Sequence, residues 1–293
     1  MSNFGKIYES TWWGNPIAGD WGDVYAQYTG NQAFEFTVNT VLGTGGSFAN
    51  QFEIPTGDGT FLYDVKTSDG YEAIGLTGDH TITFPSGAGI RTVSITGRFP
   101  QMQFSTDSVN SRDSKKLLSI DNFGIYGIGS VSQYLSFFDC ANLQILATDV
   151  GHFSSVESFF GTFSRCTSLT SIPLIDTSAG RDFSVMAFGC FNLTTFPNLN
   201  FDNGTNFFGL VYFSPIVNFP PNMFDNQTSS EFNLAFSNTN LSTQSIDGIL
   251  VSVDVSGVLN GSFTQNGGQA PSSIGIAAKD NLLAKGWTVS YTN

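Results

Sequence analysis

The stretch FSRCTSLTSIP, residues 163–173, recurs along the chain with small changes. A near copy, FGCFNLTTFP, covers residues 188–197, and an upstream version, FFDCANLQILA, covers residues 137–147. Each copy has an aromatic residue, then a cysteine, then a leucine three residues later. The three stretches are therefore versions of one structural unit.

The spacing of the unit is nearly constant. The cysteines of the three copies are followed, at further steps of 24 residues, by a serine and an asparagine in the same place: Cys140, Cys166, Cys190, Ser214 and Asn238. A fixed period between 20 and 29 residues with this Leu and Cys/Asn pattern predicts a solenoid of leucine-rich-repeat-like coils. One such coil cannot bury its own apolar side chains, but several stacked coils form a continuous core. The predicted repeat core consists of Cys140, Leu143, Cys166, Leu169, Cys190, Leu193, Ile216 and Leu241.

The three cysteines cannot all pair with each other inside one chain. They occupy one repeated position, and free cysteine is among the most buried residue types. We therefore expect buried free thiols. Their spacing is far longer than that of a zinc-binding cysteine pair, so we expect no metal site.

Composition favours a mainly β protein. Of the 293 residues, 12% are charged, 32 are glycine and 29 are phenylalanine. The formal net charge is −13 with 11 Lys and Arg residues, and none of these lies between Arg181 and Lys279. Nucleic-acid binding needs a basic surface, so no nucleic-acid partner is expected. The N-terminus lacks the pattern of a secretory signal, and no apolar run is long enough for membrane insertion.

Four segments are expected: 1–30, 31–116, 117–244 and 245–293. In the second, short runs such as AFEFTVN (33–39) and QMQF (101–104) predict strands of a small β-sandwich. The third holds the repeats. In the last segment, a helix is expected to begin at Ser245 or Asp247. A second helix, which ends before Gly286, precedes a final strand. The two helices and the strand are expected to form an α/β cap on the repeats.

The first segment is an aromatic leader. Its candidate anchoring residues are Trp12, Trp13, Trp21 and Tyr25. Clustered Trp and Tyr residues often contact a partner surface, which favours an anchor to another subunit or particle. Packing of the leader on the next domain of the same chain is the alternative.

Four parts of the chain carry a resemblance to a known family. The repeats resemble BspA-type leucine-rich repeats of bacterial and phage surface proteins, and KLLSIDNFG (116–124) resembles the entry into their first repeat. Residues 31–116 are similar to the Ig/PKD-like domain that often precedes such repeats, although TSDG (67–70) lacks the Trp of the usual turn. The end of the chain, 267–291, resembles C-terminal segments on such repeats in phage and bacterial structural proteins.

The resemblance implies a non-enzymatic structural or adhesion protein. With no export signal, it favours a phage virion protein, assembled in the host cytoplasm, that serves as a tail fibre, head fibre or decoration subunit. The leader would bind other virion proteins, and the repeats would bind a glycan or protein on the host surface. Fibres are often homotrimers, by analogy. The alternatives are a bacterial cell-surface adhesin and a fibre-borne glycan depolymerase.

No catalytic residue can be selected from the sequence, and no cofactor is expected. His80, expected in a turn, and His152 lie beside no candidate nucleophile. A glycosidase needs a carboxylate pair, and no pair stands out among Asp139, Asp149, Glu157, Asp176 and Asp182. Aromatic residues of the repeats that are candidates for stacking on sugars are Phe191, Phe207, Phe208 and Tyr212, with a core position as the alternative for each.

Overall fold

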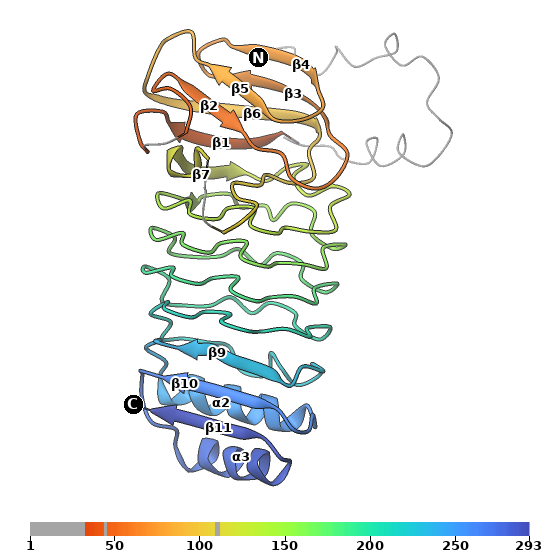
Figure 1. Ribbon diagram of the computed structural model, residues 1–293, viewed down its shortest axis with the longest axis vertical. Helices are drawn as coiled ribbons and strands as arrows, with labels where there is room; N and C mark the ends of the chain where they lie inside the picture. The colour runs from red at the N-terminus through yellow and green to blue at the C-terminus, as the bar shows by residue number, and fades with distance from the viewer. Residues whose placement is uncertain (1–32, 44–45, 109–111, 293) are drawn as a thin grey trace, which may run out of the picture. The chain divides into compact units, whose positions relative to one another are not determined.

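The computed structural model describes residues 33–43, 46–108 and 112–292, and this part of the chain is mainly β (Figure 1). Its strands are β1 (Phe34–Asn39), β2 (Gln51–Ile54), β3 (Leu62–Thr67), β4 (Glu72–Leu76), β5 (His80–Thr83), β6 (Ile90–Arg98), β7 (Leu117–Asn122), β8 (Gln144–Ile145), β9 (Glu231–Ser237), β10 (Ser262–Asn266) and β11 (Thr288–Thr292). The helices are a short 3-10 turn, η1 (Ser114–Lys116), and two α-helices, α2 (Thr243–Val255) and α3 (Ser273–Ala284). The predicted mainly β class is confirmed.

The first strands form two sheets. One has six strands in the order β4-β3-β6-β1-β7-β8, and the other pairs β2 with β5. In β1 the sequence FEFTVN alternates buried and half-buried residues, as a strand with one face in a core does. The rings of Phe36 in β1 and Phe52 in β2 lie 5.7 Å apart, so the two sheets share this core. The predicted strand at 101–104 was wrong: Met102 makes one isolated bridge to Thr56, while the Gln101 side chain donates to the Tyr134 carbonyl.

Strand β7 joins the first sheet to the repeats. It pairs antiparallel with β1 on one side and parallel with β8, in the first repeat, on the other. Next to this junction the buried Tyr126 hydroxyl donates to Gln133 Oε1 at 2.8 Å and accepts from the Met102 N–H at 3.2 Å. The two segments thus share a sheet and a hydrogen-bond network as well as a core.

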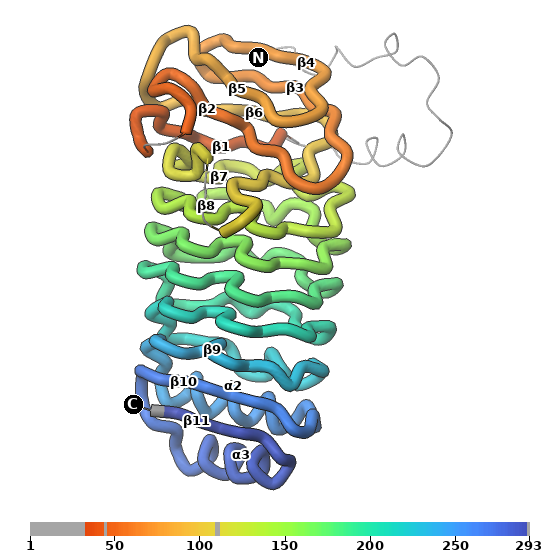
Figure 2. The backbone as a smooth tube through the Cα atoms, in the orientation of Figure 1, coloured from red at the N-terminus to blue at the C-terminus, as the bar shows by residue number. Residues whose placement is uncertain are grey.

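Successive turns of the repeat region lie one upon another, as Figure 2 shows between β8 and β9. Parallel bridges link Ser132 to Ser158, Ser158 to Asp182, and Asp182 to Asn206. Alternate N–H groups of each turn donate to carbonyls of the next: the Phe159 N–H bonds to Asp182 O at 2.8 Å. Backbone groups that one isolated turn would leave without partners are therefore satisfied by its neighbours.

Phenylalanines at one repeated position form a column in the core. The rings of Phe159, Phe183 and Phe207 are stacked at 5.4 and 5.6 Å, with 3° between the planes of each pair, and Phe232 continues the column at 5.0 Å from Phe207. Equivalent backbone positions give equivalent side-chain directions, which explains the near-parallel rings. This stacking supplies much of the apolar surface that the repeats bury.

All eight side chains of the predicted repeat core are fully buried. The cysteines are free, and two thiols donate to the preceding turn: Cys166 Sγ to Phe137 O and Cys190 Sγ to Phe163 O, each at 3.1 Å. Ser214 replaces cysteine in this column and donates to Ala187 O at 2.6 Å. Cysteine at this position thus acts as a small buried donor.

The buried cysteines are expected to resist thiol reagents in the folded protein. Burial raises the pKa of the Cys190 thiol to about 12 and those of Cys140 and Cys166 well above their usual value, and the reactive species is the thiolate. A chromogenic disulfide reagent at pH 8 should detect no thiol in native protein and all three cysteines in denaturant. Rapid labelling without denaturant would contradict this placement.

Asparagines at the outer edge of the turns also link neighbouring repeats. Asn192 Nδ2 donates to Thr167 O at 2.8 Å, and Asn203 Nδ2 donates to Ser178 O at 2.7 Å. Both belong to Asn-x-Thr triplets that resemble glycosylation acceptors. Their amides are engaged in the structure as inter-turn hydrogen-bond donors.

The last segment is a parallel sheet with helical connections. Strands β9, β10 and β11 are parallel, in the order β11-β10-β9, and α2 and α3 lie side by side along them (Figure 1). The predicted start of the first helix was wrong: it begins at Thr243, because the Ser242 side chain accepts from the Ser245 N–H and caps the helix. The second helix and the final strand agree with the prediction. One hydrophobic core cluster extends from Phe34 to Trp287.

Candidate functional site

Aromatic side chains gather on the outer face of the stacked turns. Phe191 and Phe213 are 60% and 45% exposed, and Phe188 and Tyr212 are half-buried beside them. The ring centroids of Phe188 and Tyr212 lie 5.6 Å apart, and those of Tyr212 and Phe213 lie 4.4 Å apart. Large exposed apolar groups that cluster in this way mark a binding surface more often than isolated ones do.

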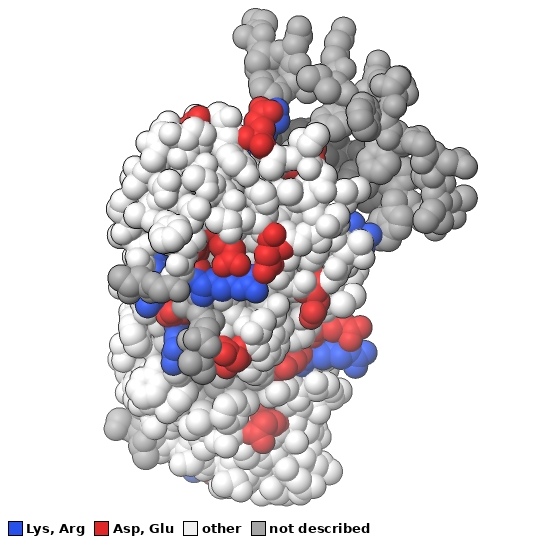
Figure 3. Space-filling view, turned by 45° about the horizontal axis from the view of Figure 1, so that its top comes forward, with Lys and Arg blue, Asp and Glu red and all other residues white. Residues whose placement is uncertain are grey.

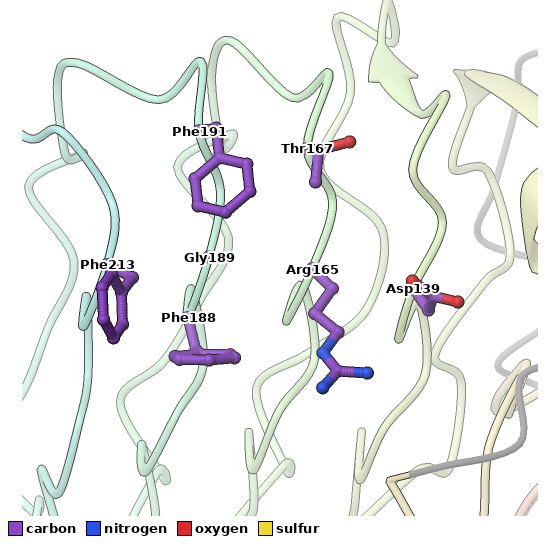
Figure 4. A pocket seen from close by; sticks show the side chains of 7 residues that line it. All are labelled: Asp139, Arg165, Thr167, Phe188, Gly189, Phe191 and Phe213. Atoms are coloured by element: carbon purple, nitrogen blue, oxygen red, sulfur yellow. The ribbon is translucent and has the colours of Figure 1, made fainter.

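These aromatic residues border a shallow hollow of about 400 Å³ (Figure 4). Its lining residues are Asp139, Arg165, Thr167, Phe188, Gly189, Phe191 and Phe213. This volume falls within the range of small-molecule sites, about 300–1,000 Å³, and a mostly apolar lining with a few polar groups is typical of them. We define these seven residues as the aromatic hollow.

The repeat itself creates the hollow. Asp139, Arg165, Gly189 and Phe213 occupy the same place in successive turns, and each has a positive φ, between 57° and 67°. The N–H of each donates to the following turn; that of Gly189 bonds to Tyr212 O at 2.9 Å. The next residue in each turn belongs to the buried cysteine and serine column. The column of positive-φ residues is therefore fixed by backbone bonds on one side and by the core on the other.

Gly189 is the member of this column without a side chain. A Cβ at this position would have Arg165 Cγ, at 4.0 Å, as its nearest neighbour, so the space above it is open. In Figure 4 this space lies between Phe213 on one side and Arg165 on the other, with Phe188 and Phe191 beside Gly189. The missing side chain thus produces the depth of the hollow.

Charged groups lie on one side of the hollow. The Arg165 guanidinium lies over the Phe138 ring, 5.4 Å from its centroid, which is a cation–π contact. Asp139, beyond Arg165 in Figure 4, forms an ion pair with Lys115 at 3.7 Å. The hollow therefore has an apolar side and a charged side.

The four predicted sugar-stacking residues have different positions. Phe191 lines the hollow and Tyr212 borders it. Phe207 is fully buried in the aromatic column, so its ring cannot meet a ligand, and its assignment as a ligand-binding residue needs correction. Phe208 is 39% exposed but does not line the hollow. Adjacent residues of one turn point to opposite sides of the backbone, which separates Phe207 from Phe208.

The sequence did not single out Phe188, Gly189, Phe213 or Arg165 as binding residues. The repeat spacing gave a clue to three of them. Arg165, Gly189 and Phe213 each stand directly before a residue of the buried cysteine and serine column: Cys166, Cys190 and Ser214. Only the stacked turns show that the residue before the column faces outward. The predicted anchoring residues, Trp12, Trp13, Trp21 and Tyr25, lie outside the described residues.

The carboxylates considered for catalysis have local structural partners. Asp149 accepts the Phe123 N–H at 2.8 Å, Asp182 accepts the Ser184 N–H at 3.0 Å, and Asp176 accepts the Ser178 N–H at 3.0 Å. Hydrogen bonds from the Ser178 hydroxyl and from the Ser178 N–H lower the pKa of the Asp176 carboxyl. Glu157 lies 3.6 Å from Arg181 in an exposed ion pair. Each of these contacts ties its carboxylate to a turn or to a neighbouring surface residue.

The histidines are likewise in structural settings. His80 begins strand β5, not a turn as predicted, and its Nε2 lies 2.6 Å from the Tyr71 hydroxyl. Burial lowers the pKa of both His80 and His152.

Within the described ranges, no group of three or more His, Cys, Asp or Glu residues is placed to bind a metal ion. The same ranges contain no helix with the length and apolarity that a membrane span requires.

Charges of both signs are mixed on the face seen in Figure 3. Most of this face is uncharged, and Lys and Arg residues lie beside Asp and Glu residues.

No family model, curated protein or solved structure matches this chain. The geometry of the aromatic hollow is therefore the main guide to function.

Proposed function

We propose that this protein is a non-enzymatic virion protein of a phage that binds the host surface through the aromatic hollow. The observation that carries the proposal is the group formed by the half-buried Phe188 and the exposed Phe191 and Phe213 around Gly189. Exposed aromatic side chains contribute strongly to binding when they are held rigidly, and the backbone bonds between turns hold these. A tail fibre, head fibre or decoration subunit would use such a surface for adhesion.

The proposed architecture has three parts after the leader. The two sheets with their shared core form an Ig-like β-sandwich, the stacked turns form a short leucine-rich-repeat solenoid, and the parallel sheet with α2 and α3 forms an α/β cap. The support for the solenoid is the coincidence of the sequence period with the inter-turn bridges. The leader, residues 1–30, would bind other virion proteins. A homotrimer would place three hollows on one fibre.

Removing two exposed rings is expected to abolish most of the adhesion. The variant Phe191→Ala/Phe213→Ala should bind host cells at least about tenfold more weakly than wild type, because both rings would lose their contact area with the ligand. Flow cytometry with fluorescently labelled protein measures this. Phe208→Ala is the matched control, since it removes an exposed ring outside the hollow and should bind as wild type. If the double variant bound host cells as strongly as wild type does, the aromatic hollow would be excluded as the adhesion site.

The location of the protein separates the proposal from its alternatives. Antibody-gold labelling of lysates from the source culture should place the protein on phage particles. Labelling of cell envelopes, with none on particles, would favour a bacterial cell-surface adhesin. Release of new reducing ends from host polysaccharide would favour a glycan depolymerase.

A further inference from the structure

We infer that the aromatic hollow takes a carboxylate-bearing sugar of a host surface glycan, with its ring over Gly189 and its carboxylate on Arg165. This inference rests on the proposed function and specifies the class of ligand. It is carried by three features that meet at one place: the group of aromatic rings, the missing side chain at Gly189 and the arginine at the edge.

The rings supply the apolar half of a sugar site. Phe213 projects from the turn that follows Gly189, and Phe188 and Phe191 lie on either side of Gly189 in its own turn (Figure 4). A pyranose ring has an apolar face of C–H groups and a polar edge of hydroxyls. The negative face of an aromatic ring attracts the weakly positive C–H groups, and stacking removes apolar surface of both partners from water.

Arg165 supplies the charge selectivity. Among the described residues, no carboxylate oxygen lies within 4.0 Å of its guanidinium nitrogens, and its contact is with the ring of Phe138. Stacking on an aromatic ring orients the planar guanidinium while its N–H groups stay available. Arginine pairs with carboxylates through two parallel hydrogen bonds, which favours a planar anion over a hydroxyl group.

The neighbouring carboxylate does not oppose this assignment. Asp139 lies on the far side of Arg165 from Gly189 in Figure 4, and the ammonium of Lys115, 3.7 Å away, offsets its charge. A carboxylate in this position can accept a hydrogen bond from a sugar hydroxyl. The charged side of the hollow thus offers both a cation and an acceptor.

The size of the hollow favours a sugar over a protein partner. Its volume of about 400 Å³ suits one or two sugar rings. A stable protein interface buries about 800 Å² on each partner, with a well-packed apolar centre. The hollow offers a small concave site with one cation instead, which matches an acidic saccharide better.

The test uses polysaccharide from the host and its carboxyl-reduced form, in which each carboxylate has become a primary alcohol. Biolayer interferometry with the full chain should show about 10- to 100-fold weaker binding to the reduced form, since a hydrogen bond to a charged group contributes this much to affinity. Arg165→Gln should weaken binding to the native form by a similar factor. The Arg165→Gln variant should bind the reduced form as strongly as wild type does. The losses of affinity caused by carboxyl reduction and by Arg165→Gln should therefore not add.

Gly189→Asn provides a second, independent variant. Its neighbours in the column carry side chains at positive φ, and asparagine tolerates this conformation, so the fold is expected to persist. The new side chain should fill the hollow and prevent binding to both forms of the polysaccharide. Phe208→Ala is again the control, and the melting temperature of each variant reports on folding.

The possible outcomes separate this inference from the proposed function. Equal binding of wild type to native and reduced polysaccharide, or unchanged binding by Arg165→Gln, would overturn the acidic-sugar assignment while host adhesion stands. If protease treatment of the cells abolished binding and the protein bound no polysaccharide, the receptor would be a protein. That result would also overturn the acidic-sugar assignment. No binding of wild type to host cells would contradict the proposed function itself.

Discussion

Replacing Lys116 with methionine is expected to destabilise the protein by about 3–5 kcal/mol, the usual cost of leaving one member of a buried ion pair alone. Lys116 is 3% exposed, and its ammonium lies 3.1 Å from a carboxylate oxygen of the fully buried Asp113. The same ammonium donates to the carbonyls of Ser47, Gln51 and Phe48 at 2.8, 3.0 and 3.1 Å. Methionine has a similar shape but satisfies none of these acceptors.

The ion pair also organises the chain before the repeats. Asp113 accepts the N–H groups of Ser47 and Glu53 at 2.8 and 2.7 Å, so the pair binds the residues around β2 to the short helix η1, directly before β7. Without the lysine, the Asp113 charge would remain buried next to acceptors that also lack a donor. The loss should therefore spread to β2 and to the start of the repeats.

Urea unfolding followed by circular dichroism measures the effect on the free energy of unfolding. Lys115→Met is the matched control, since its side chain is 50% exposed and its ion pair with Asp139 spans 3.7 Å. Exposed pairs contribute about 0–1 kcal/mol, so this variant should unfold close to wild type. Similar midpoints for the two variants would show that Lys116 is not buried as described.

Replacing Phe207 with alanine is expected to cost about 3–5 kcal/mol, as for other fully buried aromatic residues. Its ring stacks between Phe183 and Phe232 and lies 5.1 Å from both Phe201 and Phe224, so truncation would leave a cavity at the centre of the column. The turns on both sides are tied by backbone bonds, and they cannot close this cavity easily. The melting temperature should fall, and the protein should expose apolar surface to a dye such as ANS.

Phe208→Ala is the control for this substitution. The two residues are adjacent and chemically identical, but Phe208 is 39% exposed and Phe207 is fully buried. The control should cost less than about 1 kcal/mol, as surface substitutions usually do. A larger loss for Phe208 than for Phe207 would mean that the register of this turn is shifted by one residue.

Much of the fold could be predicted from the sequence because repetition carries information that a single stretch lacks. The period from Cys140 to Cys190 correctly predicted a buried column, free thiols and the leucine positions of the core. The alternation in β1 and the Gly286 stop before the final strand were also readable. Each of these features depends on local periodicity or on the conformational preference of one residue, and both are visible in sequence.

The candidate site was only partly predictable. Phe191 and Tyr212 were chosen as aromatic residues of the repeats, but so was Phe207, because an inward and an outward phenylalanine look alike in sequence. The positive-φ residue of each turn decides which neighbour faces the core. That backbone conformation is stabilised by hydrogen bonds to the next turn, about 24 residues away, and no short window of sequence contains both partners.

The pattern of residues is sufficient to predict the mainly β class, the repeat positions and the burial of the cysteines, because a recurring apolar pattern has few ways to bury its side chains. The packing of distant segments was needed to show that Lys116 is buried with Asp113, that β7 joins the first sheet to the repeats, and that Arg165, Gly189 and Phe213 line a hollow. These features arise where residues from different turns or sheets meet. Their energies depend on distances across the fold, which the order of residues along the chain does not specify.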